Sequence, residues 1–222
     1  MKIAIDGPSG AGKSTAAKLL AKRLNMVYLD TGAMYRAAAL YAYCNGVAFT
    51  AEDIAPILPK INIDIKYGEN AGGQTVYLNG EDVSADIRKH FVSKLASDIS
   101  ALPPVRLFLV DLQRQLAAQN GARGVILDGR DVGTFVLPDA EFKFYLTASV
   151  DERACRRFLE LTQKGEVCDI ERLKEDIERR DYNDMSRALA PLKKAADAIE
   201  IDSTYMGIDQ VVEFMAEVIS AQ

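Results

Sequence analysis

The sequence has few of the residues that commonly hold metals or cross-link a chain. Three cysteines and one histidine occur among 222 residues. The cysteines, Cys44, Cys155 and Cys168, are odd in number and lack the spacing of a metal site, so we expect buried or incidental thiols in a reducing compartment. The single histidine, His90, has no second histidine or nearby cysteine to form a metal site with, so we expect it to be a solvated surface residue. A histidine-based catalytic triad or a histidine-rich metal site is excluded.

Long apolar runs and an excess of positive charge are also missing. No apolar stretch approaches the roughly 20 residues that span a bilayer. The first residues bring Asp6 and a glycine-rich loop rather than a secretion signal. The formal net charge of −5 provides no general field for nucleic acid or an anionic membrane. We therefore expect a cytoplasmic protein with no nucleic-acid or membrane partner, and a monomer by default.

What the chain does have is an alternation of short apolar runs and helical patterns, which predicts an α/β fold with a doubly wound parallel sheet. Five apolar runs are typical of buried strands: Lys2–Asp6, Met26–Asp30, Gly124–Asp128, Glu141–Leu146 and Ala198–Asp202. The helical patterns lie at Lys13–Leu24, Pro104–Gln119, Asp151–Lys164, Asp169–Arg180 and Ile208–Ser220. Most of the strands end in aspartate, at the sheet edge where such folds bind ligands.

Two stretches interrupt the alternation. Residues 61–67, "INIDIKY", alternate strictly between apolar and polar side chains, which predicts a half-exposed antiparallel strand. The segments "GENAGGQ" and "TVYLNGEDVS" follow and predict a glycine-rich turn and a tight turn at Asn79-Gly80. Residues 151–190 carry many arginines on two predicted helices. The chain is therefore interpreted as one core with two additions.

The segment "GPSGAGKS", Gly7–Ser14, matches G-x-x-x-x-G-K-[ST] between a predicted strand and a predicted helix. The glycines permit a tight turn whose backbone N–H groups surround phosphate oxygens. Lys13 can reach the β- and γ-phosphates, and Ser14 can ligate Mg²⁺. The pattern predicts nucleoside triphosphate binding but leaves the acceptor open. No N-K-x-D segment is present, which argues against a GTPase switch.

Two further segments follow predicted strands and face the same sheet edge. In "LDTGAMYR", Thr31 and Gly32 are expected to form a turn, and Arg36 beside Tyr35 can grip a monophosphate. In "ILDGRDVGT", Asp128 can order Mg²⁺ or its waters, and the next residues form a polar turn. The alternatives, a surface arginine with a packing tyrosine and a merely structural turn, stay open at this point.

Four segments in order, "GPSGAGKST", "LDTGAMYRA", "LDGRDVGT" and "SRALAPL", together resemble the bacterial type of cytidylate kinase over essentially the whole chain. The resemblance implies the P-loop nucleoside monophosphate kinase fold. Its core would comprise residues 1–38, 84–150 and 191–222, with a monophosphate-binding insert at 39–83 and a helical lid at 151–190. It also implies phosphate transfer from ATP to CMP and dCMP, with Mg²⁺, in pyrimidine nucleotide metabolism.

The resemblance carries roles onto matching positions. The residues expected at ATP are Gly7, Pro8, Ser9, Gly10, Ala11, Gly12, Lys13, Ser14, Thr15 and Arg157. Those expected at CMP are Thr31, Tyr35, Arg36, Ser97, Arg106, Arg130, Asp131, Asp184 and Arg187. Those expected to be catalytic are Lys13, Asp128, Arg130, Arg180 and Arg187, with Ser14 ligating Mg²⁺ and Asp128 acting directly or through water.

Cytosine chemistry supports this mapping independently of the resemblance. Cytosine offers an amino donor at N4, which an ionised Asp131 can accept, and Arg106 can donate to its other edge atoms. Uracil has a carbonyl in place of the amine and would oppose Asp131 acceptor to acceptor. An ordinary intramolecular salt bridge remains the alternative for this pair. An adenylate- or shikimate-type kinase, or a nucleotide-dependent regulator, remains the alternative for the whole chain.

Overall fold

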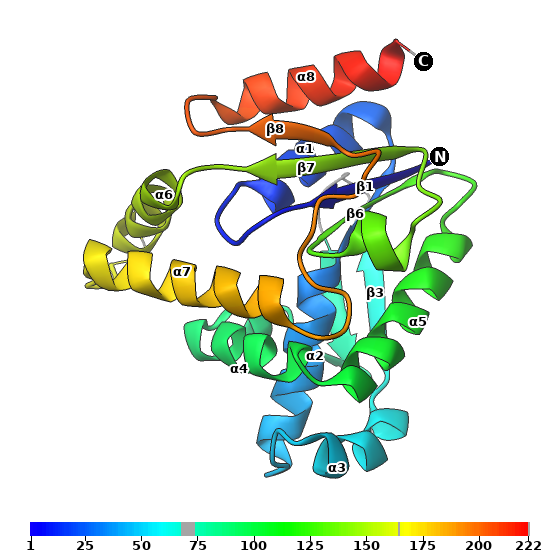
Figure 1. The fold of residues 1–222 in the computed structure, drawn as a ribbon. Coiled ribbons are helices and arrows are strands. Elements are labelled where there is room, and N and C mark those ends of the chain that lie inside the picture. Colours follow the sequence, from blue (N-terminus) through cyan, green and yellow to red (C-terminus); the bar gives the residue numbers. More distant parts are fainter. Residues whose placement is uncertain (68–73, 164, 222) are drawn as a thin grey trace. The chain divides into compact units, whose positions relative to one another are not determined.

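The computed structural model describes residues 1–67, 74–163 and 165–221 (Figure 1). Its main sheet has five strands in the order β2-β6-β1-β7-β8. These strands are β1 (Lys2–Asp6), β2 (Val27–Asp30), β6 (Val125–Gly129), β7 (Phe142–Thr147) and β8 (Ile199–Asp202). The pairs β1–β7 and β7–β8 are parallel. The predicted five-stranded parallel sheet is confirmed, with each strand starting and ending within a residue of its predicted bounds.

The chain divides into two compact units. Unit 1 comprises Met1–Lys2 and Ala21–Leu127, and unit 2 comprises Ile3–Leu20 and Asp128–Gln222. Helix α1 (Lys13–Leu24) begins in unit 2 and ends in unit 1. Each unit is considered by itself below.

Unit 1 holds a short antiparallel sheet and several helices. The sheet has the order β3-β4-β5, formed by β3 (Ile63–Tyr67), β4 (Gln74–Leu78) and β5 (Glu81–Asp82). The helical elements are α2 (Thr31–Cys44), α3 (Ala51–Ile54), η1 (Ala55–Lys60), η2 (Asp86–Arg88), α4 (His90–Ser100) and α5 (Pro103–Gln119). The predicted antiparallel insertion is confirmed, whereas the predicted glycine-rich turn falls mostly on 68–73, outside the described residues.

The hairpin between β4 and β5 shows why the insertion could be predicted. The alternating residues Ile61, Ile63 and Ile65 are buried on one face. Asn79 and Gly80 adopt φ values of 51° and 90°. Two consecutive positive φ angles are what a type I′ turn requires, and they suit the right-handed twist of the flanking strands.

The predicted turn at Thr31 and Gly32 is wrong, because both residues already belong to α2. Asp30 is the N-cap of this helix, and its Oδ1 accepts a hydrogen bond from the Ala33 amide at 3.0 Å. An aspartate at this position satisfies one of the free N–H groups of the first turn, so the helix can begin directly at the strand end.

Unit 2 contains the remaining helices. They are η3, a π-helical turn at Val132–Val136, and α6 (Val150–Gln163), α7 (Ile170–Ser186) and α8 (Ile208–Ser220). Helices α6 and α7 pack against each other. The predicted end of α7 at Arg180 is wrong, because the helix continues to Ser186. The added turns bury Asp181 and Asp184, so tertiary ion pairs extend a segment that has no apolar periodicity. Lys164, at the predicted end of α6, lies outside the described residues.

The scarce residues occupy ordinary positions. Cys44 and Cys155 are exposed and Cys168 is half-buried, all with free thiols, so these cysteines are incidental rather than buried. His90 is exposed, as expected of a surface residue. Within the part of the chain that the structure describes, no helix is long and apolar enough to cross a membrane.

Gly7 follows β1 and lies against the neighbouring strand β7. A Cβ atom added to Gly7 would lie 1.9 Å from the carbonyl oxygen of Leu146. We expect Gly7→Ala to lower the free energy of unfolding by at least about 3 kcal/mol, because a backbone atom cannot move aside. Urea denaturation followed by circular dichroism measures this cost.

Gly46 provides the matched control. It has a φ of 65°, and a Cβ added there would meet nothing within 4 Å. Gly46→Ala should therefore cost only about 1 kcal/mol, the strain of a left-handed alanine. Equal costs for the two substitutions would contradict the packing argument.

Candidate active site

The glycine-rich loop joins β1 to α1 in unit 2 and ends in a buried lysine. Lys13 is 5% exposed, and its Nζ donates a hydrogen bond to the carbonyl oxygen of Pro8 at 2.7 Å. Burial, followed by the charge of nearby Arg130, lowers the pKa of Lys13 well below its ordinary value of 10.5. The charged form of Lys13 is therefore disfavoured in this position, and a bound anion would stabilise it.

The first helical hydroxyl meets a carboxylate from the end of β6. Ser14 Oγ donates to Asp128 Oδ2 at 2.6 Å, and Asp128 is buried. A hydroxyl and a carboxylate are oxygen donors of the type that Mg²⁺ prefers, and Mg²⁺ typically takes few protein ligands beside phosphate and water. The described residues contain no cluster of three or more His, Cys, Asp or Glu that could hold a metal alone. The donor set thus fits a magnesium ion that is shared with a bound phosphate.

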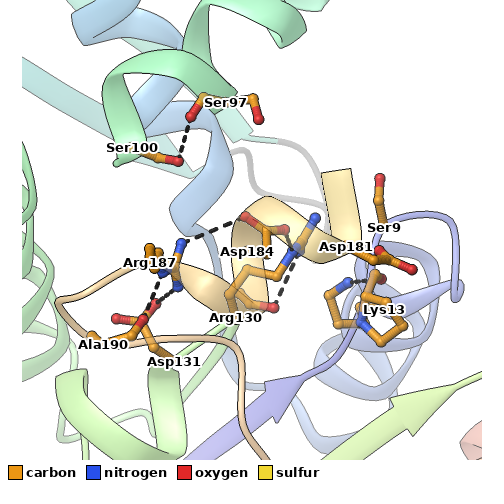
Figure 2. A network of polar contacts seen from close by, with 12 residues as sticks. Ser9, Lys13, Ser97, Ser100, Arg130, Asp131, Asp181, Asp184, Arg187 and Ala190 are labelled. Atoms are coloured by element: carbon orange, nitrogen blue, oxygen red, sulfur yellow. Dashed lines mark hydrogen bonds and ion pairs between the residues drawn. The ribbon is translucent and has the colours of Figure 1, made fainter. Parts of the chain in front are cut away.

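A network of two arginines and two aspartates adjoins this loop within unit 2 (Figure 2). Arg130 Nε donates to Asp184 Oδ2 at 2.8 Å. Arg187 Nη1 lies 3.6 Å from Asp184 Oδ1, and Arg187 Nη2 lies 3.4 Å from Asp131 Oδ1. Asp184 therefore joins the end of α7 to Arg130 in the turn after β6. Arg187, just after α7, contacts Asp131 in the same turn.

The charges in this network control one another. Burial alone would raise the pKa of Asp184, but Arg130, Arg180 and Arg187 outweigh burial and hold the pKa below its ordinary value of 3.8. Burial acts to lower the pKa of Arg130, and the Asp184 carboxylate raises it. Arg130 and Asp184 therefore hold each other in their ionised forms although both are buried.

Two further arginines with predicted roles lie on α6 and α7. Arg157 is half-buried, and its Nη1 pairs with Glu160 Oε2 at 2.8 Å on the same helix. Arg180 is half-buried on α7, and its charge acts on both Lys13 and Asp184. Unit 2 thus brings Lys13 and Ser14 of the loop together with Asp128, Arg130 and Asp184, whereas the ion pair of Arg157 stays on its own helix.

Unit 1 holds the other predicted acceptor residues. The Arg106 guanidinium lies 5.7 Å from the ring centre of Tyr35, and its Nη1 donates to the Ser100 carbonyl oxygen at 3.2 Å. Ser97 belongs to the same turn of α4, where its carbonyl oxygen accepts from Ser100 Oγ at 2.8 Å (Figure 2). Arg106 is 1% exposed, so it is no ordinary surface arginine. Within unit 1, Arg106 thus contacts Tyr35 directly and is linked to Ser97 through Ser100.

Arg36 forms a second anion-binding candidate in unit 1, and the buried Thr31 starts the same helix. Arg36 Nη2 pairs with Asp30 Oδ2 at 2.7 Å, while Arg36 Nε is buried and meets no hydrogen-bond partner among the described residues. Asp30 also caps α2, so one carboxylate fixes both the helix start and the guanidinium. This arrangement leaves Arg36 with a donor for a further anion.

Sequence reasoning missed Asp6, which ends β1 directly before the loop. Its two carboxylate oxygens accept hydrogen bonds from the amides of Val132 at 2.8 Å and Gly133 at 2.7 Å. Those amides follow Arg130 and Asp131, so Asp6 holds the turn that presents these two residues. The only signal in the sequence was an aspartate at a strand end, which did not single out its partners.

Sequence reasoning also missed a buried ion pair between α6 and α7. Arg153 Nη1 lies 2.7 Å from Asp181 Oδ2, and the same Nη1 donates to the Ser9 carbonyl oxygen at 3.0 Å. No local pattern predicts a contact between helix residues so far apart in the sequence.

Comparisons with known proteins agree on one family. A family model described as cytidylate kinase matches residues 3–221. A cytidylate kinase from Caldicellulosiruptor saccharolyticus is 51% identical over 218 residues, covering 98% of this chain and 94% of that protein. One from Lactobacillus gasseri is 50% identical over 220 residues, covering 99% and 94%. A solved structure of an uncharacterized protein from Eubacterium ventriosum has a TM-score of 0.51 at 12% identity, covering 100% of this chain and 99% of that one, which supports the fold alone.

The buried position of Asp6 leads to a test of pH dependence. Burial, partly offset by the Gly133 and Val132 amides, raises the pKa of Asp6 from its ordinary value of 3.8 to about 6. The folded protein therefore holds this proton more tightly than the unfolded chain. The stabilisation from this proton is complete below the unfolded pKa and is lost as the pH rises through about 6.

We expect the difference in free energy of unfolding between wild type and Asp6→Asn to shift in favour of the wild type by about 1 kcal/mol from pH 7 to pH 5. The variant cannot titrate at this position, so the comparison cancels the effects of other groups. Chemical denaturation at both pH values measures the shift. A difference that is independent of pH, or of the opposite sign, would contradict the raised pKa.

Proposed function

Since the chain belongs to the cytidylate kinase family, we propose that it transfers the γ-phosphate of ATP to CMP and dCMP, giving ADP and CDP or dCDP. The observation that carries the proposal is the network of Arg130, Asp131, Asp184 and Arg187, which lies beside Lys13 in one unit. It gathers several cations beside a triphosphate-binding loop, and Asp131 adds a carboxylate of the kind that reads an amino group.

On the donor side, we propose that the loop from Gly7 to Thr15 binds the ATP phosphates through its backbone N–H groups and Lys13. The negative charge of bound phosphate would compensate the buried ammonium group, so ATP should raise the pKa of Lys13. Arg157 would contribute from α6, where it now pairs with Glu160. We assign residues 151–190 to a lid and 39–83 to a monophosphate-binding insert.

Ser14 and Asp128 are the residues that we propose for Mg²⁺. Their close hydroxyl–carboxylate pair is a hard oxygen donor set, with room in its coordination number for phosphate oxygens and water. When bound, the ion would supply charge neutralisation at the phosphate oxygens.

On the acceptor side, we propose that Arg36 and Arg130 hold the CMP phosphate and that Thr31, Tyr35, Asp184 and Arg187 complete its surroundings. Ser97, Arg106 and Asp131 would read the base. An ionised Asp131 accepts a hydrogen bond from the cytosine amine, whereas a uracil carbonyl would face it without a proton between them. Arg187 Nη2 lies 3.4 Å from Asp131 Oδ1, so the two residues proposed to surround the acceptor are already in contact.

The reaction needs positioning more than proton transfer. An oxygen of the CMP phosphate, already largely ionised near neutral pH, forms a bond to the γ-phosphorus as the bond to the bridging oxygen breaks. The electron pair of that bond leaves with ADP. Lys13 holds the donor oxygens, while Arg130, Arg180 and Arg187 offset the charge spread over the transferring group. Exclusion of water by the lid would prevent hydrolysis of ATP.

The first test is a coupled assay of ADP formation with a panel of acceptors. We expect CMP and dCMP to be phosphorylated in preference to UMP, AMP and shikimate. Lys13→Met should lower kcat by about a hundredfold or more with an unchanged circular dichroism spectrum, because the donor loses its buried cation. A preference for AMP or shikimate would refute the cytidylate assignment, and full activity of the lysine variant would refute the donor assignment.

The second test concerns the base. Asp131→Asn replaces one carboxylate oxygen with an NH₂ group, which can donate to the uracil carbonyl and leaves a single, uncharged acceptor for the cytosine amine. We expect the ratio of kcat/KM for CMP to that for UMP to fall by about a hundredfold. Asp131→Ala serves as the control, since it removes the acceptor without adding a donor and should lower CMP turnover without improving UMP. An unchanged ratio in Asp131→Asn would contradict the assignment of Asp131 as the base-reading residue.

A further inference from the structure

Arg153 joins three segments of unit 2 from a buried position near the start of α6. The residue is 4% exposed. Its Nε donates to the Ala148 carbonyl oxygen at 2.9 Å, and its Nη1 donates to the Ser9 carbonyl oxygen at 3.0 Å. The same Nη1 pairs with Asp181 Oδ2 on α7 at 2.7 Å. One guanidinium thus contacts the residue that follows β7, the glycine-rich loop and helix α7.

On the loop side, the contact includes both the carbonyl group of Ser9 and the backbone of Gly10. A Cβ added to Gly10 would lie 3.2 Å from the Cβ of Arg153, so the arginine stem packs where a side chain is missing. A loop that binds phosphate through its N–H groups must keep its carbonyl oxygens turned away from the anion. The hydrogen bond from Arg153 holds the Ser9 carbonyl in that orientation.

On the helix side, Asp181 belongs to the face of α7 that carries the network. Arg180 is the adjacent residue, and Asp184 follows Asp181 by three positions, which places both aspartates on one side of a helix. Asp184 is the residue that binds Arg130 at 2.8 Å. A constraint on Asp181 therefore sets the rotation of the helix face that presents Asp184.

The ion pair between Arg153 and Asp181 contributes more to the orientation of α7 than to the stability of the fold. Asp181 is buried, and its Oδ1 has no hydrogen-bond partner within the described residues, so Arg153 is the cation that compensates this carboxylate by direct contact. Buried ion pairs contribute little net stability compared with apolar side chains of similar size. Their geometry, however, allows few alternative arrangements.

We infer that Arg153 is a positioning residue, which through Ser9 and Asp181 holds the glycine-rich loop and the network face of α7 in one orientation. The inference rests on the proposed function in that the anion to be bound is ATP. Without Arg153, the loop and α7 would each keep their local structure but lose their common alignment. Both ATP affinity and kcat would then fall, since small misplacements of catalytic groups cost large factors in rate.

The test replaces the ion pair with an apolar pair, Arg153→Met with Asp181→Leu, which leaves no buried charge uncompensated. We expect this double variant to unfold at a temperature close to that of the wild type. Its Kd for a nonhydrolysable ATP analogue, measured by calorimetry, should rise about tenfold, and kcat should fall about tenfold or more. A double variant with the wild-type Kd and kcat would overturn the inference.

Lys174→Met is the matched control. Lys174 also joins α7 to α6, through an ion pair with Asp151 at 2.9 Å, but it is more exposed and is not among the contacts of the loop. We expect wild-type Kd and kcat for this variant. An equal loss in Lys174→Met would show that general packing of α6 on α7 sets the alignment, and would overturn the specific role of Arg153.

Arg153→Lys decides the matter if the double variant does not fold. It keeps the charge, but a single ammonium cannot reproduce the planar set of contacts, so we expect a rise of about threefold to tenfold in the Kd of the analogue. A wild-type Kd would overturn the inference. Binding of the ATP analogue needs no acceptor, so it can be measured whether or not CMP is the substrate. A wild type that binds the analogue but does not phosphorylate CMP would refute the proposed function, and the comparison of Kd values between wild type and variants would still test the role of Arg153.

Discussion

Repulsion among cations is the constraint on which the rest of this structure depends. A site for polyphosphate must hold positive groups close together before any phosphate is present. The lowered pKa of Lys13 shows the electrostatic cost, since burial and the charge of Arg130 both disfavour its ammonium form. The lowered pKa of Asp184 shows the compensation, since this carboxylate stays ionised although it is buried. The carboxylates are therefore as necessary to an anion site as the cations.

Three carboxylates in unit 2 also fix the geometry of the groups around them. Asp184 spans Arg130 and Arg187, and Asp6 holds the amides that follow the polar turn. Asp181 receives the guanidinium that also binds the loop. Because Asp184 accepts a hydrogen bond from Arg130, and Asp6 accepts two from backbone amides, these contacts define direction and not only net charge. An incoming phosphate would meet donors that are already aimed, with little reorganisation left to perform.

The parts of the site that could be predicted from the sequence are those with local signatures. The loop at Gly7–Ser14 has a fixed spacing, and the turn at Asn79-Gly80 needs two residues that tolerate positive φ. The extension of α7 and the pair Arg153–Asp181 could not be predicted, because they depend on partners distant in the chain. A helix rich in charge resembles a solvated helix until its partners are known. The prediction of a turn at Thr31 and Gly32 was wrong for another reason: an aspartate such as Asp30 is common both in turns and at helix N-caps.

Asp30 also shows how an arginine can be held in position while some of its N–H donors stay unused. Its Oδ1 caps α2 and its Oδ2 holds one terminal nitrogen of Arg36, so the guanidinium plane is fixed relative to the helix. Arg36 Nε is buried and has no hydrogen-bond partner among the described residues. A guanidinium has five N–H donors, so a carboxylate that occupies one nitrogen leaves others for a phosphate. Lysine could not divide its role in this way, because its donors share a single nitrogen on a flexible stem. The geometry thus suits the role proposed for Arg36, in which the side chain is held in place and still has donors for an anion.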